Sequence, residues 1–458
     1  MNKNEIKDFL LQMREKVLEL SDKFKNPVSM HEYAEYVRVR EDGKEIWTKA
    51  FQKAIDENEF VFIPSKDTPY FLDDTVIISS NRHIKAEDGA VIRLTEETTV
   101  LMMRNKNTKD GSDMPIDTYD KDDNISITGG RWEESRNTRL GYGRTGLYDK
   151  DRSFFGVSTC MFFNNIENLS LTNMTFAHAA GFAVQTGNLK NGVFENITFC
   201  ECYADGLHIN GNTENLFIRN IQGQVGDDLV ALNMYDWKNS SVNFGPMKNV
   251  FCENLDMAPD GEYKAMRILP GVYYFKDNSY VDCSVENLYV KNVKGVTTFK
   301  LYLQTRQYVI GEEEPECGAV GSGDNIYFED INVDLTYPID AFDEYLNSDP
   351  IRGAFACFEF GSNIKNVYFK NIDITLHKDK FPLSYFITVG PKSIRNGEKE
   401  VFDPYLSSVV ENIYIDDVRI NGCSDWNIED AIKVTSFENV NNDGKSTARG
   451  RIGNIICE

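Results

Sequence analysis

The fold is decided by four short segments, NLSLTN (168–173), NGVFEN (191–196), NLFIRN (215–220) and NVFCEN (249–254). Each begins and ends with Asn, and most of the second and fourth residues are apolar. Five further segments follow the same pattern, with Gly or Asp in place of the second Asn in three of them: NISITG (124–129), NLYVKN (287–292), NIYFED (325–330), NVYFKN (366–371) and NIYIDD (412–417). One structural unit therefore repeats from about Asn124 to the end of the sequence.

The pattern within each unit is typical of a β-strand with one buried face, because apolar residues alternate with polar ones. The recurring Asn indicates a bend, since Asn tolerates a left-handed backbone and bonds its own main chain. The closest segments start 23 and 24 residues apart, and the other gaps are 34 to 46 residues. The short gaps fit a coil of three short strands, and the longer ones fit the same coil with inserted loops. Helical solenoids and leucine-rich repeats require other spacings. The sequence therefore predicts an all-β fold, a single right-handed parallel β-helix.

The N-terminal region predicts helices before this repeat. Residues 4–24 carry apolar side chains at helical spacing among many charges. A second helix is expected at 46–57, where it would cap the open end of the solenoid. The first helix either extends that cap or packs outside it. We expect a helical extension over residues 1–40 and a β-helix domain over residues 41–458.

Composition restricts the partners. The chain has 72 acidic and 49 basic residues, a net charge of −23, which argues against nucleic acid and against an anionic membrane surface. No run of 18 apolar residues predicts a membrane span. The N-terminus lacks the apolar core of a signal peptide, and the nine cysteines are scattered. These features predict reduced thiols and a cytoplasmic location. The sequence does not indicate an oligomeric state.

Three acidic residues stand out on the two shortest coils. Asp205 lies 14 residues after Asn191, and Asp227 and Asp228 lie 12 and 13 residues after Asn215. Equal offsets on stacked coils are about 4.8 Å apart, so the three carboxylates are expected to converge. Such a cluster is unfavourable unless a proton, a metal or another cation compensates. It predicts an acid–base site, and the alternatives are turn residues or a calcium site.

The surrounding motifs, YADGLHING (203–211) and GDDLVALN (226–233), resemble the NTDGIHI and GDDCVAI motifs of the polygalacturonases, glycoside hydrolase family 28. Upstream, DGKEIWTKAFQKAID (42–56) and DNISITGGRW (123–132) also resemble pectin-degrading β-helix enzymes. The resemblance implies inverting hydrolysis of a glycosidic bond. It implies that Asp227 is the general acid and that Asp205 and Asp228 hold and activate water. An inverting acid–base pair is about 6.5–9.5 Å apart.

Two departures from the family bear on the substrate. The Gly-His-Gly motif has no counterpart after GDDLVALN. In AMRILPG (265–271), Arg267 matches the family's carboxylate-binding Arg, but Leu269 replaces the Lys, and Lys300 is the candidate replacement from the next coil. These changes favour a related pectic oligosaccharide or another glycoside over plain polygalacturonate.

Three other residues are candidates for substrate contact. His208 either touches sugar or hydrogen-bonds a catalytic Asp. Tyr235 and Trp237 follow the second acidic motif, where aromatic rings either stack on sugar or pack in the protein. The remaining histidines have no partners at metal-ligand spacing, so neither a metal nor a cofactor is predicted.

Two rival functions stay open. A β-helix polysaccharide lyase or epimerase would need calcium and an Arg or Lys base, and no basic residue adjoins the acids in sequence. A non-catalytic carbohydrate-binding β-helix would bind sugar without the acids. The partner expected in every case is an oligosaccharide or polysaccharide.

Overall fold

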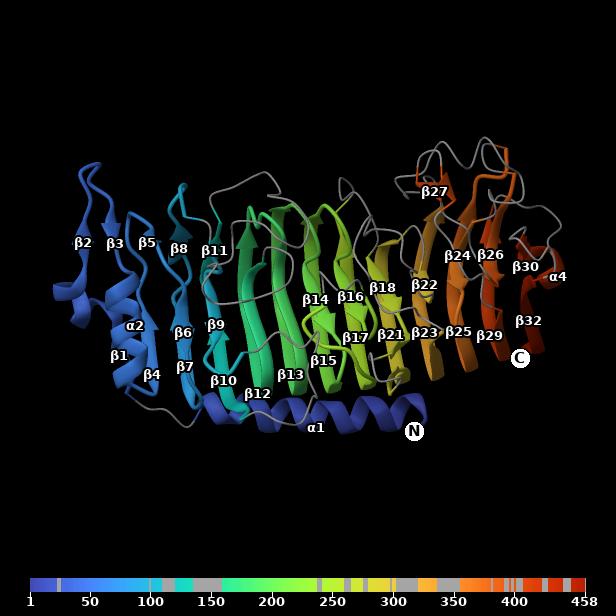
Figure 1. Cartoon of the computed structure of the whole chain (residues 1–458), viewed down its shortest axis with the longest axis horizontal. Coiled ribbons are helices and arrows are strands. Elements are labelled where there is room, and N and C mark those ends of the chain that lie inside the picture. Colours follow the sequence, from blue (N-terminus) through green and yellow to red (C-terminus); the bar gives the residue numbers. More distant parts are fainter. Residues whose placement is uncertain are drawn as a thin grey trace.

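The structure is a computed structural model of a parallel β-helix, and this fold class is the predicted one (Figure 1). It describes residues 1–22, 26–98, 100–108, 120–134, 159–236, 241–258, 265–274, 279–296, 299–301, 320–335, 355–379, 382–390, 395–396, 399–400, 407–421, 427–439 and 446–457. The coils stack along the long axis, from the first strands at one end to the C-terminal strands at the other. All strand pairs between successive coils are parallel.

The Asn-containing segments form one wall of the helix, which we call the first face. Its strands are β1 (Val28–Ser29), β4 (Phe60–Ile63), β7 (Arg82–Ala86), β10 (Asp122–Thr128), β12 (Thr159–Ala177), β13 (Phe182–Cys202), β15 (Thr213–Val225), β17 (Met247–Met257), β21 (Val285–Val296), β23 (Ser322–Leu335), β25 (Asn363–Leu376), β29 (Ser408–Asn421) and β32 (Ser446–Cys457). Several of these strands bend and continue onto the neighbouring walls.

A second wall, the site face, precedes the first Asn of each coil. It consists of β6 (Val76–Ile78), β9 (Met103–Asn105), the beginnings of β12 and β13, and then β14 (Leu207–Asn210), β16 (Val230–Asn233), β18 (Met266–Leu269), β22 (Phe299–Leu301), β24 (Phe355–Phe360), β26 (Ser384–Val389) and β30 (Ile432–Val434).

The third wall begins with β3 (Glu45–Ile46), β5 (Tyr70–Leu72), β8 (Val91–Leu94) and β11 (Arg131–Glu133), and continues in the ends of the long strands. Short antiparallel pairs join β3 to β2 (Arg38–Val39), β19 (Gly271–Tyr274) to β20 (Tyr280–Cys283), β27 (Arg395–Asn396) to β28 (Lys399–Glu400), and β32 to β31 (Ser436–Asn439). Among the described residues, the helical elements are α1 (Lys3–Asp22), the 3₁₀ helix η1 (Met30–Tyr36), α2 (Thr48–Glu57) and α4 (Ile428–Ala431).

The Asn residues make the corners between walls, as predicted. Asn168, Asn191 and Asn215 have φ values of 60°, 61° and 62°, in the left-handed region that Asn tolerates. Their side chains also bond along the axis: Nδ2 of Asn191 donates to Oδ1 of Asn168, and Nδ2 of Asn215 donates to Oδ1 of Asn191, each at 2.9 Å. Each Asn therefore shapes its own corner and joins two coils.

The apolar side chains of the repeat point into the coils and form the core. Leu169 and Leu171 on one coil, and Leu216 and Ile218 on another, are all 0% exposed. They belong to one apolar cluster that continues along the described coils. The alternation in the sequence thus corresponds to one buried face on every strand.

Helix α2 closes the N-terminal end of this core. Its buried residues Ala50, Phe51, Ala54 and Ile55 join the central apolar cluster. The predicted cap is confirmed, since the helix covers apolar side chains that the first coil would otherwise expose.

Helix α1 is not part of the cap; it packs outside the β-helix, which is the second of the two arrangements considered. It lies along the first face, under the coils in Figure 1. Its Ile6, Leu10, Met13 and Val17 pack on outward side chains of the strands. The sheet itself begins at Val28, because β1 pairs with β4. Strand pairing thus starts within the segment expected to be a helical extension.

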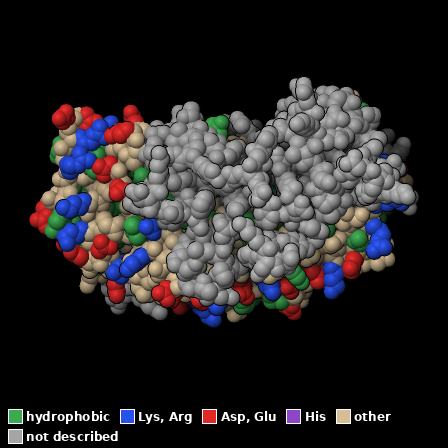
Figure 2. All heavy atoms as spheres, in the orientation of Figure 1, with side chains coloured by type: hydrophobic (Ala, Val, Ile, Leu, Met, Phe, Trp, Pro, Cys, Tyr) green, Lys and Arg blue, Asp and Glu red, His purple; other side chains and the backbone are tan. Residues whose placement is uncertain are grey.

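The described surface mixes charges of both signs. Figure 2 shows acidic and basic side chains interspersed over the N-terminal coils rather than gathered into one patch. Among the described residues, no helix is long and apolar enough to cross a membrane.

Candidate active site

The three predicted acids lie in two turns that lead into the site face. Asp205 precedes β14, and Asp227 and Asp228 precede β16 on the next coil. Leu207 of β14 pairs with Val230 of β16, an offset of 23 residues. By the same offset Asp205 lies beside Asp228.

A β-bulge produces this alignment. On the first face the same two coils are 24 residues out of step, but the register changes between Phe199 and Cys202 of β13. The bulge absorbs one residue, so acids at different offsets from their Asn become neighbours. The turns also touch closely: a Cβ at Gly226 would lie 2.3 Å from the carbonyl oxygen of Tyr203. Only Gly fits at this approach.

The acids form a tight cluster. One carboxylate oxygen from each of Asp205, Asp227 and Asp228 lies within 4.8 Å of the others. Asp205 and Asp228 are 0% exposed, whereas Asp227 is partly exposed. The backbone N–H of Asp228 donates to Oδ1 of Asp205 at 3.0 Å. Two of the carboxylates are therefore fixed inside the protein, and the third reaches its surface.

The predicted acid–base spacing is not observed. The nearest oxygens are closer than the roughly 6.5–9.5 Å that leaves room for water between an inverting acid and base. The short separation follows from the stacking of the two turns on adjacent coils, which differ by one strand spacing.

Arg267 lies against this cluster, on β18 of the following coil. Its Nε is 2.9 Å from Oδ2 of Asp228, and its Nη2 is 3.7 Å from Oδ2 of Asp205. Burial opposes the charge of Arg267, but the carboxylates of Asp228, Asp205, Asp227 and Asp236 raise the pKa of its guanidinium well above the ordinary value. Arg267 therefore stays a cation and balances part of the acidic charge.

The position of Arg267 differs from what the sequence suggested about basic residues near the acids. The sequence placed no basic residue beside the acids, but the structure places Arg267 there.

His208 is held between two carboxylates. Its Nδ1 lies 2.5 Å from Oδ2 of Asp205, and its Nε2 lies 3.4 Å from Oδ2 of Asp236. The ring is 0% exposed and stacks on Phe182, with centroids 3.8 Å apart and planes 16° apart. Its Nε2 also lies 3.3 Å from Nδ2 of Asn210 and 3.3 Å from Nδ2 of Asn233. Of the two predicted roles for His208, the structure shows the hydrogen bond to Asp205.

Lys300 continues the row one coil further on. Ile268 pairs with Leu301, so Arg267 and Lys300 are neighbours on the site face. Lys300 is 1% exposed, and on its other side it pairs in register with buried Glu359 of β24. Two cationic side chains thus follow each other along the row that leads away from the acids.

Of the two predicted aromatic contacts, only Tyr235 is among the described residues. Tyr235 packs against the central apolar core, and its ring centroid is 5.6 Å from that of Phe244. This is the packing alternative for Tyr235. Trp237 lies outside the described residues.

Sequence reasoning missed several buried polar residues around His208. Asn233 donates to Oδ2 of Asp236 at 3.0 Å, and Gln185 donates to Oδ1 of Asn210 at 3.0 Å. Asn210 lies two residues after His208, and Asn233 is its partner on the next strand. Since side chains two apart on a strand share a face, the alternation could have placed both Asn residues on the same face as His208. Asp236 follows a strand and carries no such signal.

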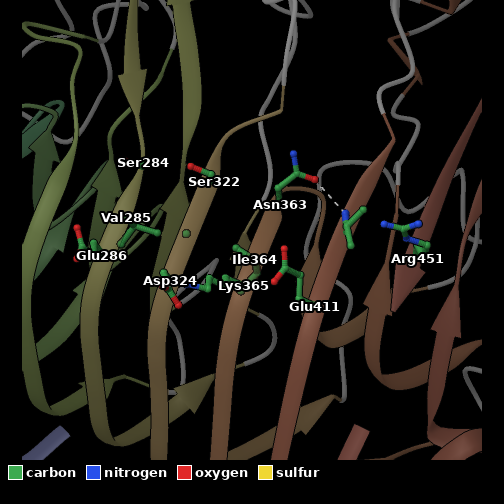
Figure 3. Close-up of a pocket in the computed structure, with 12 residues that line it drawn as sticks. Ser284, Val285, Glu286, Ser322, Asp324, Asn363, Ile364, Lys365, Glu411 and Arg451 are labelled. Carbon is green, nitrogen blue, oxygen red and sulfur yellow. Dashed lines mark hydrogen bonds and ion pairs between the residues drawn. The ribbon is translucent and has the colours of Figure 1, made fainter. Parts of the chain in front are cut away.

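A pocket of about 590 Å³ lies elsewhere, across β21, β23, β25, β29 and β32 (Figure 3). Glu286, Asp324 and Lys365 line it, and Lys365 pairs with Asp324 at 3.5 Å. The backbone N–H of Val409 donates to Asn363 at its edge. None of the clustered acids lines this pocket.

Comparisons with known proteins bear on the fold. No protein-family model matches the chain, and no curated protein sequence matches it significantly. Among solved structures, the hyperthermoactive exopolygalacturonase of Thermotoga maritima aligns with 98% of this chain and 96% of its own, at 12% identity and a TM-score of 0.53.

Two further structures align less closely. The family 28 exopolygalacturonase of Yersinia enterocolitica covers 88% of this chain and 77% of its own, at 13% identity and a TM-score of 0.48. A surface adhesin of Streptococcus pneumoniae covers 94% of this chain and 100% of its own, at 14% identity and a TM-score of 0.43. At 12% identity, the Thermotoga maritima structure shows the fold alone.

Proposed function

We propose that this protein is a glycoside hydrolase that cleaves O-glycosidic bonds in a pectin-derived, galacturonate-type or related oligosaccharide. The observation that carries the proposal is the cluster of Asp205, Asp227 and Asp228, whose oxygens lie within 4.8 Å of one another. An exopolygalacturonase with the same fold agrees with an oligosaccharide substrate.

Asp227 is the general acid in this proposal. It alone of the three is partly exposed, so it alone can reach the glycosidic oxygen of a bound sugar. Proton transfer from a placed carboxylic acid contributes roughly 10²–10⁴ to the rate.

Asp205 and Asp228 hold and activate the attacking water. Both are 0% exposed, so a sugar carbon does not reach them. Arg267 and His208 contact these carboxylates and favour their ionised form. Because no sugar carbon reaches these two carboxylates, neither is placed to attack it, and the reaction proposed is single displacement with inversion.

The charge of the row supports an anionic sugar. Arg267 and Lys300 are adjacent cations in a chain whose net charge is −23. Lys300 is 1% exposed, so it acts on the carboxylate of a uronic acid through its charge rather than by direct contact. Lys300→Met then raises KM for uronate oligosaccharides and leaves KM for neutral ones unchanged.

The test compares the protein with Asp227→Asn on a panel of uronate and neutral oligosaccharides, with and without EDTA. Release of reducing ends that resists EDTA and falls at least 10³-fold in the variant is expected. Asp256→Asn, an exposed Asp on β17, is the matched control and should retain full activity. Absorbance at 235 nm follows unsaturated products.

Two outcomes contradict the proposal. Unsaturated product lost in EDTA identifies a lyase. Sugar binding by isothermal titration, equal in the protein and in Asp227→Asn and without turnover on any substrate, identifies a non-catalytic binding module.

A further inference from the structure

An outward row of side chains runs along the first face, one residue from each coil. Strand register aligns Val193, Phe217, Phe251, Tyr289, Tyr327, Tyr368 and Tyr414. Helix α1 covers the first four, which are at most 3% exposed. The row then continues past the start of the helix, where Tyr368 and Tyr414 are partly exposed.

The contacts of α1 show what this face binds. An apolar stripe, Ile6, Leu10, Met13 and Val17, lies on the row. Beside this row runs a second one in which acidic and basic residues alternate. Basic residues of α1 meet its acids: Lys3 with Glu329 at 2.5 Å, Lys7 with Glu253 at 3.9 Å and Arg14 with Glu195 at 2.5 Å. The face therefore recognises an amphipathic helix with a basic edge.

The same surface extends beyond the helix as a pocket. Its volume is about 430 Å³, and Asn2 and Lys3, at the start of α1, are among its lining residues. Tyr327, Tyr368 and Tyr414 line it. The neighbouring charged row continues alongside as Lys370 and Asp416, an ion pair at 2.5 Å. We call this surface the tyrosine groove.

The tyrosine rings do not form a platform for sugar. Tyr327 and Tyr368 stack with centroids 4.4 Å apart and planes 11° apart, and Tyr368 and Tyr414 stack at 4.4 Å and 10°. Their faces are thus turned towards one another along the axis. A sugar stacks on a ring face, whereas an apolar side chain packs equally well on ring edges.

We propose that the tyrosine groove binds an amphipathic helix of a partner protein, in line with α1. The groove continues an interface that already holds such a helix, and it has the same two rows. Tyr414 pairs in turn with Ile456 of β32. From Tyr327 to Ile456 the row crosses three strand spacings, about 14 Å, which about nine residues of helix span. The partner segment has two or three turns, an apolar stripe and a Lys or Arg that meets Asp416. This binding does not depend on the proposed hydrolase activity.

The test uses a fluorescent peptide of residues 1–22, which carries the known chemistry, and the full-length protein. Fluorescence anisotropy should show saturable binding, and a scrambled peptide should not bind. The resident α1 is tethered, so its high effective concentration keeps the free peptide out of its own site.

Variants locate the binding. Tyr368→Ser with Tyr414→Ser should raise Kd at least tenfold, and Asp416→Lys, which disturbs no apolar packing, should raise it about fivefold. Tyr203→Ser is the control, because Tyr203 is 44% exposed and lies away from the groove. No saturable binding to the unaltered protein, or equal Kd in the groove variants, overturns the proposal. Self-association that is lost in the double Ser variant, seen by light scattering, also overturns it, because a second copy is then the occupant.

Discussion

Nδ1 of His208 lies 2.5 Å from Oδ2 of Asp205, and neither side chain is exposed to solvent. This buried contact is costly to break, because the Asp205 carboxylate then loses a hydrogen bond that Arg267, 3.7 Å away, does not replace. We expect His208→Ala to lower the free energy of unfolding by about 3 kcal/mol, measured by urea denaturation.

The partner substitution checks that the cost arises from this contact. Adding Asp205→Asn to His208→Ala removes the stranded charge and should restore at least half of the lost stability. Additive losses in the double variant would show that the two side chains are not coupled.

The stereochemistry of the product tests the burial of Asp205 and Asp228. Single displacement predicts that the first sugar released has the opposite anomeric configuration to the substrate. Proton NMR spectra within the first minutes, before mutarotation, distinguish the two anomers. A retained configuration would mean that one carboxylate reaches the sugar carbon, and it would refute the water-holding role.

His83 predicts a loss of stability in acid. Burial lowers the pKa of its imidazole from 6.5 to about 4, and its Nδ1 lies 2.5 Å from Oγ of Ser126. Between these values the unfolded chain binds the proton and the folded chain does not. The stability that the neutral His83 side chain contributes is thus present above pH 6.5 and is lost as pH falls towards 4.

The size of this effect follows from linkage. Because of the buried imidazole, the free energy of unfolding at pH 4.5 is about 2 kcal/mol lower than at pH 7. Urea titrations of the protein and of His83→Gln at both pH values should differ by this amount, with the variant losing less. Parallel losses in the two proteins would assign the acid sensitivity to other groups.

At the Asn corners, we expect replacement by Gly to reduce stability less than replacement by Ala. Asn191 has a φ of 61° and joins two bonds of the Asn ladder. Asn191→Ala loses both bonds and adds strain of roughly 1–2 kcal/mol. Asn191→Gly loses the same bonds without the strain, so Gly should be the less harmful replacement in urea denaturation. Equal losses would show that backbone conformation is not what selects Asn there.

The repeating walls were predictable because both of their causes are local. Alternating apolar residues set the buried face of each strand, and Asn sets each corner through its own backbone. The approach of Asp205 to Asp228 was predictable in outline for the same reason. Their direct pairing was not, because it depends on the bulge between Phe199 and Cys202, which has no marker in the sequence.

Contacts between distant segments were harder to predict from the sequence. Arg267 matched a family motif, but its ion pair with Asp228 joins residues 39 apart across a long insertion. Asp236 lies after a strand, where no periodicity indicates the direction of its side chain. The apolar stripe of α1 showed that the helix packs on something, but not on which of the walls.

The position of α1 also sets an order of events during synthesis. Lys3 contacts Glu329, a residue 326 positions later, and Arg14 contacts Glu195. The ribosome makes the helix first, yet its binding surface is complete only after most coils have formed. The apolar stripe of the nascent helix therefore stays unpacked until those coils have formed. The contacts between α1 and the distant coils are among the last to form.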